Sequence, residues 1–116
     1  MILLTKDQIL TQDDLKSEIV SVPEWGGDVR VCTMSGFSRD RFEADIIGKN
    51  GGVNTSNIRA KLAAATITDE NGKLLFDEAD IAKLGHKSCA ALDRVFAAAQ
   101  RLNMITSKDV EGLAKN

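Results

Sequence analysis

The residues of this chain that could do chemistry are few, and their spacing assembles no reaction centre. His86 is the only histidine, and acid–base catalysis by an imidazole needs a partner that orients the ring. It follows Gly85, where a short helix is expected to end, and a histidine there is usually a surface or capping residue. Cys32 and Cys89 form no CxxC or Cys/His pattern, and a zinc site needs three or four ligands. We therefore expect no catalytic residue, no metal site and two reduced thiols, a disulfide being an option only in an oxidising compartment.

Three other clusters have the composition of functional motifs without their spacing. Residues 69–72 (Asp-Glu-Asn-Gly) contain calcium-type ligands, but no twelve-residue ligand loop with a closing glutamate follows, and Asn-Gly favours a turn. Residues 48–52 are glycine-rich with one lysine, yet they lack the spacing of a phosphate-binding loop. Asp77, Glu78 and Asp80 gather where a helix is expected to begin, and the helix dipole accounts for them. The sequence thus predicts a protein that is not an enzyme and has no cofactor.

The most distinctive segment is residues 22–31, which contain the only proline, the only tryptophan and a Gly-Gly pair between β-type residues. This composition predicts a tight hairpin with Trp25 at its tip. The indole could cover the hairpin or Pro23, or it could anchor an interface, since tryptophan dominates binding hot spots; both roles stay open. Met34 and Phe37 lie close by in the sequence. The candidate protein-interaction residues are therefore Trp25, Pro23, Met34 and Phe37.

The bulk properties exclude several classes of function. A chain of 116 residues has the size of one domain and can bury a core without metals or disulfides, so we expect a single domain over 1–116. The net charge of -2 comes with no basic stripe, which argues against nucleic-acid binding. There is no run of about 20 apolar residues for a membrane span, and residues 1–6 lack a signal-peptide pattern. We place the protein in a cytosol.

Apolar periodicity and capping residues predict an α+β fold that is mainly helical. One β-hairpin (about 17–22 and 28–34) packs on about four helices, because a lone hairpin is marginal in water. Alternation in the second strand places Val29 and Val31 on one face and Arg30 and Cys32 on the other. Helices are expected at about 5–10, 35–48, 54–65, 77–84, 87–102 and 106–113, with caps at Thr5, Ser35 or Ser38, one of Asn54, Thr55 and Ser56, Asp77, and Thr106. The longest helix should bury Leu92, Val95, Phe96, Ala99 and Leu102.

Several of these segments together resemble a known family. Their order and spacing are similar to those of the tail assembly chaperones of long-tailed bacteriophages and prophages. The similarity spans nearly the whole chain and is carried by Val22-Pro23-Glu24-Trp25-Gly26-Gly27, Val29-Arg30-Val31, Ser35-Gly36, Arg39-Asp40, Phe42-Glu43, residues 69–72 with Leu75-Phe76, Leu84-Gly85-His86-Lys87-Ser88, and residues 91–96, 99–103 and 114–116.

The resemblance implies a role without chemistry. Members of this family bind the long, aggregation-prone tape measure protein, help to bring in the tail tube protein, and leave before the tail is complete. The implied partners are therefore the tape measure protein and the tail tube protein, with self-association as a further option and the host bacterial cytoplasm as the location. An alternative is a small structural tail or head–tail connector protein, which would remain in the virion.

Many members are made in two forms through a programmed ribosomal frameshift. Ala114-Lys115-Asn116 can be encoded as GCA-AAA-AAC, which contains the slippery run A-AAA-AAC. The sequence of the gene and of its downstream frame tests this expectation.

Overall fold

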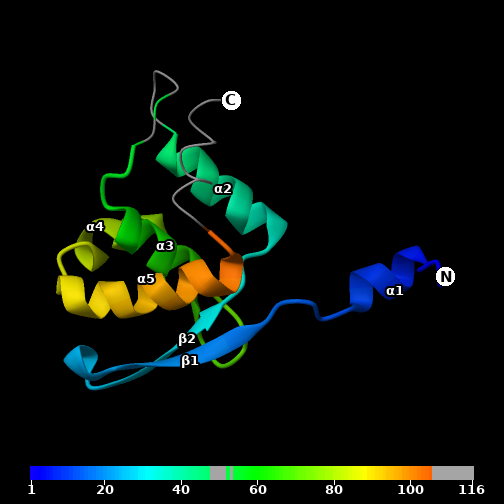
Figure 1. The fold of residues 1–116 in the computed structure, drawn as a ribbon, viewed down its shortest axis with the longest axis horizontal. Helices are drawn as coiled ribbons and strands as arrows, with labels where there is room; N and C mark the ends of the chain where they lie inside the picture. Colours follow the sequence, from blue (N-terminus) through cyan, green and yellow to red (C-terminus); the bar gives the residue numbers. More distant parts are fainter. Residues whose placement is uncertain (48–51, 53, 106–116) are drawn as a thin grey trace.

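The computed structural model describes residues 1–47, 52 and 54–105 and shows the expected α+β fold, mainly helical (Figure 1). The loop expected at 48–52 lies largely outside the described residues, and the helix expected at 106–113 lies wholly outside them. The elements in chain order are α1 (Lys6–Thr11), β1 (Ser17–Val22), the 3-10 turn η1 (Pro23–Trp25), β2 (Gly27–Cys32), α2 (Gly36–Ile46), α3 (Ile58–Thr66), β3 (Ile67–Thr68), the 3-10 turn η2 (Glu78–Asp80), α4 (Ile81–Leu84) and α5 (Cys89–Asn103).

The predicted hairpin is confirmed, with its second strand slightly shorter than expected. β1 and β2 pair antiparallel from Ser17 opposite Cys32 to Val22 opposite Gly27. Between them η1 ends at Gly26, whose φ of 75° lies in the left-handed region that glycine enters without steric cost. β3 was not expected: its two residues pair antiparallel with β2, which gives the strand order β1-β2-β3.

One face of this sheet is apolar and lies against α5. Exposure alternates along β1, and Val22 is fully buried, which is the pattern of a strand with one solvated face. Val31 on β2 is also fully buried, whereas Ile19 on the opposite face is 58% exposed. The prediction that Val29 and Val31 share one face is therefore confirmed, and the structure shows that this face packs on the core.

Most of the remaining core is made by α3 and α5, which pack side by side above the sheet (Figure 1), and α2 adds Phe42 and Ile46. Small side chains let the two helices approach closely, and α3 buries three alanines. The buried residues of the two helices are Ala60, Leu62, Ala63, Ala64, Thr66, Ala91, Leu92, Val95, Ala98 and Ala99. The predicted stripe on α5 is confirmed for Leu92, Val95 and Ala99, whereas Phe96 and Leu102 are only partly buried.

Most of the predicted helix starts are confirmed, but the start of α3 is different. Thr5 and Asp77 each make a complete capping box, and the Ser35 side chain accepts from the Ser38 N–H. The residue before α3 is Asn57, which has a left-handed φ of 57° and makes no side-chain cap. Its amide instead donates to the Ile81 carbonyl at 3.2 Å, so a contact with α4 takes the place of the expected local cap.

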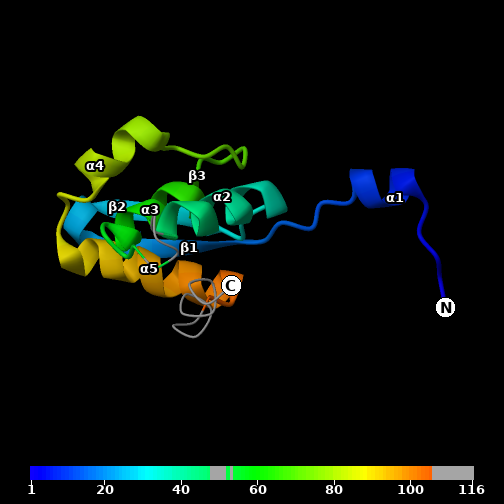
Figure 2. The same cartoon turned by 90° about the horizontal axis from the view of Figure 1, so that it is seen from above.

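The first sixteen residues form an arm that leaves the rest of the molecule. α1 lies clear of the sheet and of the other helices in both views (Figures 1 and 2), and none of its residues is buried. We call residues 1–16 the N-terminal arm and the remainder of the described chain the body.

Candidate protein-interaction site

Trp25 lies at the tip of the hairpin and is held there by the body. Its ring is half-buried and packs against the core cluster, and η1 contacts α5. Beside it, the Arg94 Nε donates to the Glu24 carboxylate at 2.9 Å. This hydrogen bond, with a smaller backbone contribution, lowers the pKa of Glu24. Trp25 therefore fastens the hairpin tip to α5 while part of its ring stays in solvent.

Pro23 is the first residue of η1 and is exposed. Proline suits this position because its fixed φ favours the turn and its missing N–H needs no partner. Together, Pro23 and the exposed part of Trp25 form one of two candidate contact surfaces, which we call the hairpin tip.

Met34 and Phe37 lie at the other end of β2. That strand has six residues, and at about 3.3 Å per residue it spans roughly 20 Å. Met34 is half-buried against the core, whereas Phe37, in the first turn of α2, is 77% exposed. The four predicted residues therefore lie on two separate surfaces and do not make one continuous patch.

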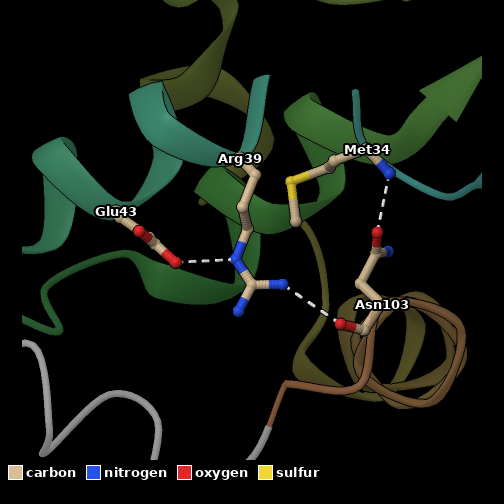
Figure 3. A network of polar contacts seen from close by, with 4 residues as sticks. All are labelled: Met34, Arg39, Glu43 and Asn103. Atoms are coloured by element: carbon tan, nitrogen blue, oxygen red, sulfur yellow. Dashed lines mark hydrogen bonds and ion pairs between the residues drawn. The ribbon is translucent and has the colours of Figure 1, made fainter. Parts of the chain in front are cut away.

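A polar network fixes the junction that positions Met34 and Phe37 (Figure 3). The Met34 N–H donates to the Asn103 Oδ1 at 2.6 Å, and the Asn103 Nδ2 donates to the carbonyls of Cys32 and Ala99. Arg39 donates to the Asn103 carbonyl at 3.1 Å and to the Glu43 carboxylate at 2.8 Å. The end of α5 is thus bonded both to the exit of β2 and to the first turns of α2.

Phe37 also lines an apolar groove that the sequence did not reveal. The hollow has a volume of about 290 Å³ and lies between α2, α3 and the segment 74–81. Its apolar lining is formed by Phe37, Phe42, Ala64, Ala65, Leu74, Phe76 and Ile81. We call it the α2–α3 groove.

Charged side chains surround this groove. Arg41 and Glu78 form an ion pair at 2.6 Å, and the hydrogen bond with Glu78 raises the pKa of Arg41. Asp45, Lys61 and Asp77 also line it. An apolar floor with a polar rim is the usual anatomy of a protein-binding surface. The sequence offered one clue, the adjacent Leu74, Leu75 and Phe76, but no pattern that would place them opposite Phe37.

The groove continues toward the root of the N-terminal arm. A second hollow of about 410 Å³ is lined by Leu15 and Lys16 of the arm and by Cys32 and Met34. The two hollows share Ser38, Ala65 and Leu74. Most of the other residues that line the second hollow are polar or charged, among them Asp13, Arg30 and Asn71, so the apolar surface is concentrated in the α2–α3 groove.

The side chains with reactive groups are dispersed in the described part of the chain. His86 is exposed, and within residues 1–47, 52 and 54–105 no three His, Cys, Asp or Glu side chains lie close enough to hold a metal ion. Cys32 and Cys89 form no disulfide with each other in the structure, and their sulfur atoms contact Thr68 and Asp93. Of the helices that the structure describes, none has the length and apolar character needed to cross a membrane.

Comparison with known proteins supports the fold-level resemblance. No protein-family model and no curated protein sequence matches the chain. Among solved structures, the chain is similar to the bacteriophage HK97 tail assembly chaperone, with a TM-score of 0.61 and 17% identity. The similarity covers 87% of this chain and 95% of the HK97 chain. The chain therefore has the fold of a phage tail assembly chaperone, as its sequence segments suggested.

Proposed function

We propose that this protein is a phage tail assembly chaperone that binds the tape measure protein and assists assembly of the tail tube. In this proposal it acts in the host bacterial cytoplasm, performs no catalysis and is absent from the finished virion. The observation that supports it best is the structural similarity to the HK97 chaperone over nearly the full length of both chains.

The surface features are compatible with that role. A chaperone for a long helical client needs apolar contact sites on a body that folds without the client. The core of this body is built from buried residues of the sheet and of α2, α3, α4 and α5, while the hairpin tip and the α2–α3 groove remain accessible. These two surfaces contain Pro23, Trp25 and Phe37 of the four residues that the sequence suggested, and Met34 lines the adjacent second hollow.

A binding experiment with matched variants tests the role and separates the two surfaces. Purified protein is titrated against the tape measure protein encoded near its gene, using wild type, Trp25→Ala and Phe37→Ala. Ile19→Ala is the control, because Ile19 is also an exposed apolar residue but lies on the open face of the sheet, 58% exposed. Truncation of a hot-spot residue costs at least about 2 kcal/mol, so we expect the dissociation constant to rise at least about thirtyfold for the variant on the client-binding surface.

Three results would count against the proposal. Wild type that does not bind the tape measure protein contradicts the function itself. If Trp25→Ala and Phe37→Ala bind the tape measure protein as tightly as Ile19→Ala does, neither the hairpin tip nor the α2–α3 groove is the client site. Detection of the protein in purified virions would favour the structural tail or connector role instead.

A further inference from the structure

β1 forms a free edge of the sheet. In the described part of the chain the strand order is β1-β2-β3, so the outer side of β1 has no neighbouring strand. Proteins usually protect such an edge with proline, lysine or a β-bulge, because it can pair with another chain. β1 pairs with β2 without a bulge from Ser17 to Val22, and its six residues include neither proline nor lysine. This edge is therefore open to a further strand.

The hydrogen-bond register shows which backbone groups face that edge. The Thr33 N–H donates to the Lys16 carbonyl at 2.8 Å. Because bonded and non-bonded pairs alternate in an antiparallel ladder, the even-numbered residues of β1 bond to β2. The N–H and carbonyl groups that point outward belong to the odd-numbered residues, Ser17, Ile19 and Ser21. Among the residues that the structure describes, none pairs its backbone with these groups.

The side chains along this edge form a graded pattern. Those of Ser17, Ile19 and Ser21 lie on the open face of the sheet, and Ile19 is 58% exposed. The Arg30 Nη1 donates to the Ser17 Oγ at 3.1 Å, whereas Asp28 is the register partner of Ser21. Within the described residues, neither Arg30 nor Asp28 takes part in an ion pair. The edge thus has a cationic end, an apolar centre and an anionic end.

The cationic end is also hollowed. The second hollow of about 410 Å³ borders Ser17, and its charged lining residues are Lys16, Arg30 and Asp13. A carboxylate on an added strand opposite Ser17 would lie beside Arg30. Ser21 lies about 13 Å farther along the edge, at ~3.3 Å per residue. A basic residue four positions away on the same added strand would therefore lie beside the anionic end.

We propose that the free edge of β1 binds an extended segment of another protein, which joins the sheet as an antiparallel fourth strand. In chain order the segment has a basic, an apolar and an acidic residue at alternate positions, opposite Ser21, Ile19 and Ser17. In this mode of recognition main-chain hydrogen bonds give affinity and alternate side chains give specificity. The inference does not rest on the chaperone role, because these residues belong to neither the hairpin tip nor the α2–α3 groove.

A nuclear magnetic resonance titration of the full chain with a synthetic peptide tests the proposal. The probe is acetyl-Thr-Lys-Thr-Val-Thr-Glu-Thr-amide, and the control peptide has the reverse order. At saturation we expect amide hydrogen exchange at Ser17, Ile19 and Ser21 to slow at least about tenfold, while the even-numbered amides, which already bond to β2, change little. The reversed peptide places like charges beside Arg30 and Asp28 and should bind at least about fivefold more weakly.

Protein variants separate edge pairing from a general loss of structure. Ser21→Pro removes an outward N–H and leaves the ladder with β2 intact, a position where edge strands tolerate proline. Ser21→Thr keeps that N–H and is the matched control. We expect the dissociation constant for the probe to rise at least about tenfold for Ser21→Pro and to change little for Ser21→Thr.

A charge exchange gives a test that leaves the backbone unchanged. Asp28 is exposed, so Asp28→Lys should weaken the probe, and a peptide with glutamate in place of its lysine should restore binding. Unchanged exchange at the outward amides, equal binding of the two peptide orders, or failure of the exchanged peptide to restore binding would overturn the proposal. Protection of the same amides at high protein concentration without peptide would also overturn it, since the edge would then pair with a second copy.

Discussion

Asn103 is expected to contribute more to stability than its position at the end of a helix suggests. Its side chain makes three hydrogen bonds: it accepts from the Met34 N–H at 2.6 Å and donates to the carbonyls of Ala99 and Cys32 at 2.9 and 3.3 Å. Asn103→Ala removes all three. It also leaves the partly buried Met34 N–H without its acceptor, at the junction of β2, α2 and α5.

The size of the effect follows from these contacts. A hydrogen bond contributes a net ~0.5–1.5 kcal/mol, and a donor left unpaired in a partly buried site costs about 1–3 kcal/mol. The two bonds that Asn103 donates contribute about 1–3 kcal/mol together and the unpaired Met34 donor costs about 1–3 kcal/mol. The sum for Asn103→Ala is therefore about 2–6 kcal/mol, a large share of the ~5–15 kcal/mol that keeps a domain folded. With a mid-range urea m-value of about 2 kcal/mol/M, the midpoint should fall by about 1–3 M.

Urea unfolding followed by circular dichroism measures this shift. Gln100→Ala is the control, since Gln100 lies one turn earlier on the same helix and is also half-buried. Asn103→Asp separates the two halves of the contact, because a carboxylate still accepts from the Met34 N–H but cannot donate to the two carbonyls. Substitutions of inert surface residues usually change stability by no more than about 0.5 kcal/mol. If Asn103→Ala differs from Gln100→Ala by no more than this, the polar network in Figure 3 does not fasten α5 to the rest of the body.

Two smaller predictions concern the hairpin tip and the packing of α3 on α4. Glu24→Gln should lower the thermal midpoint at pH 7, and its difference from wild type should shrink as the pH falls through the carboxyl range near ~4.3. The reason is that the hydrogen bond from Arg94 lowers the pKa of Glu24. The ion pair therefore stabilises the fold above the ordinary pKa of a glutamate, and this stabilisation is lost as Glu24 becomes protonated. A difference in thermal midpoint that does not change with pH would refute this prediction. A Cβ on Gly85 would lie 2.2 Å from the Asn57 Oδ1, so Gly85→Ala should displace the Asn57 amide from the Ile81 carbonyl and destabilise the fold by about 1 kcal/mol. In an Asn57→Gly background the same change should stabilise by ~0.4–1 kcal/mol, and equal effects in both backgrounds would contradict the contact.

The elements that the sequence predicted are those defined by local chemistry. The capping boxes of Thr5 and Asp77 depend on residues three positions apart, and the hairpin depends on a turn that needs Gly26 in the left-handed region. Long-range contacts decided what was missed. β3 is two residues long and exists because Ile67 and Thr68 pair with β2, a contact that no local pattern announces.

The residues of the candidate site also differ in whether local sequence or long-range packing reveals them. Trp25 could be singled out by its type and its place in a turn, and the structure does place it at the hairpin tip. Sequence proximity suggested that Met34 and Phe37 would join it, but an extended strand carries residues apart at ~3.3 Å per position. The α2–α3 groove brings Phe37 beside Leu74 and Phe76, which are nearly forty positions away, so only the packing of α2 against α3 could show it.

Trp25 is half-buried, so both roles that the sequence left open, a structural role in the hairpin and a role as an interface anchor, are compatible with its position. Because the ring packs on the core next to the Glu24–Arg94 ion pair, Trp25→Ala should lower stability as well as any binding by the hairpin tip. Loss of client binding in that variant is therefore informative only when its folded fraction equals that of wild type at the assay temperature. Phe37 at 77% exposure lacks this coupling, since its removal takes little from the core. A comparison of the two variants thus separates a tip that binds the client from a tip that only fastens the hairpin to α5.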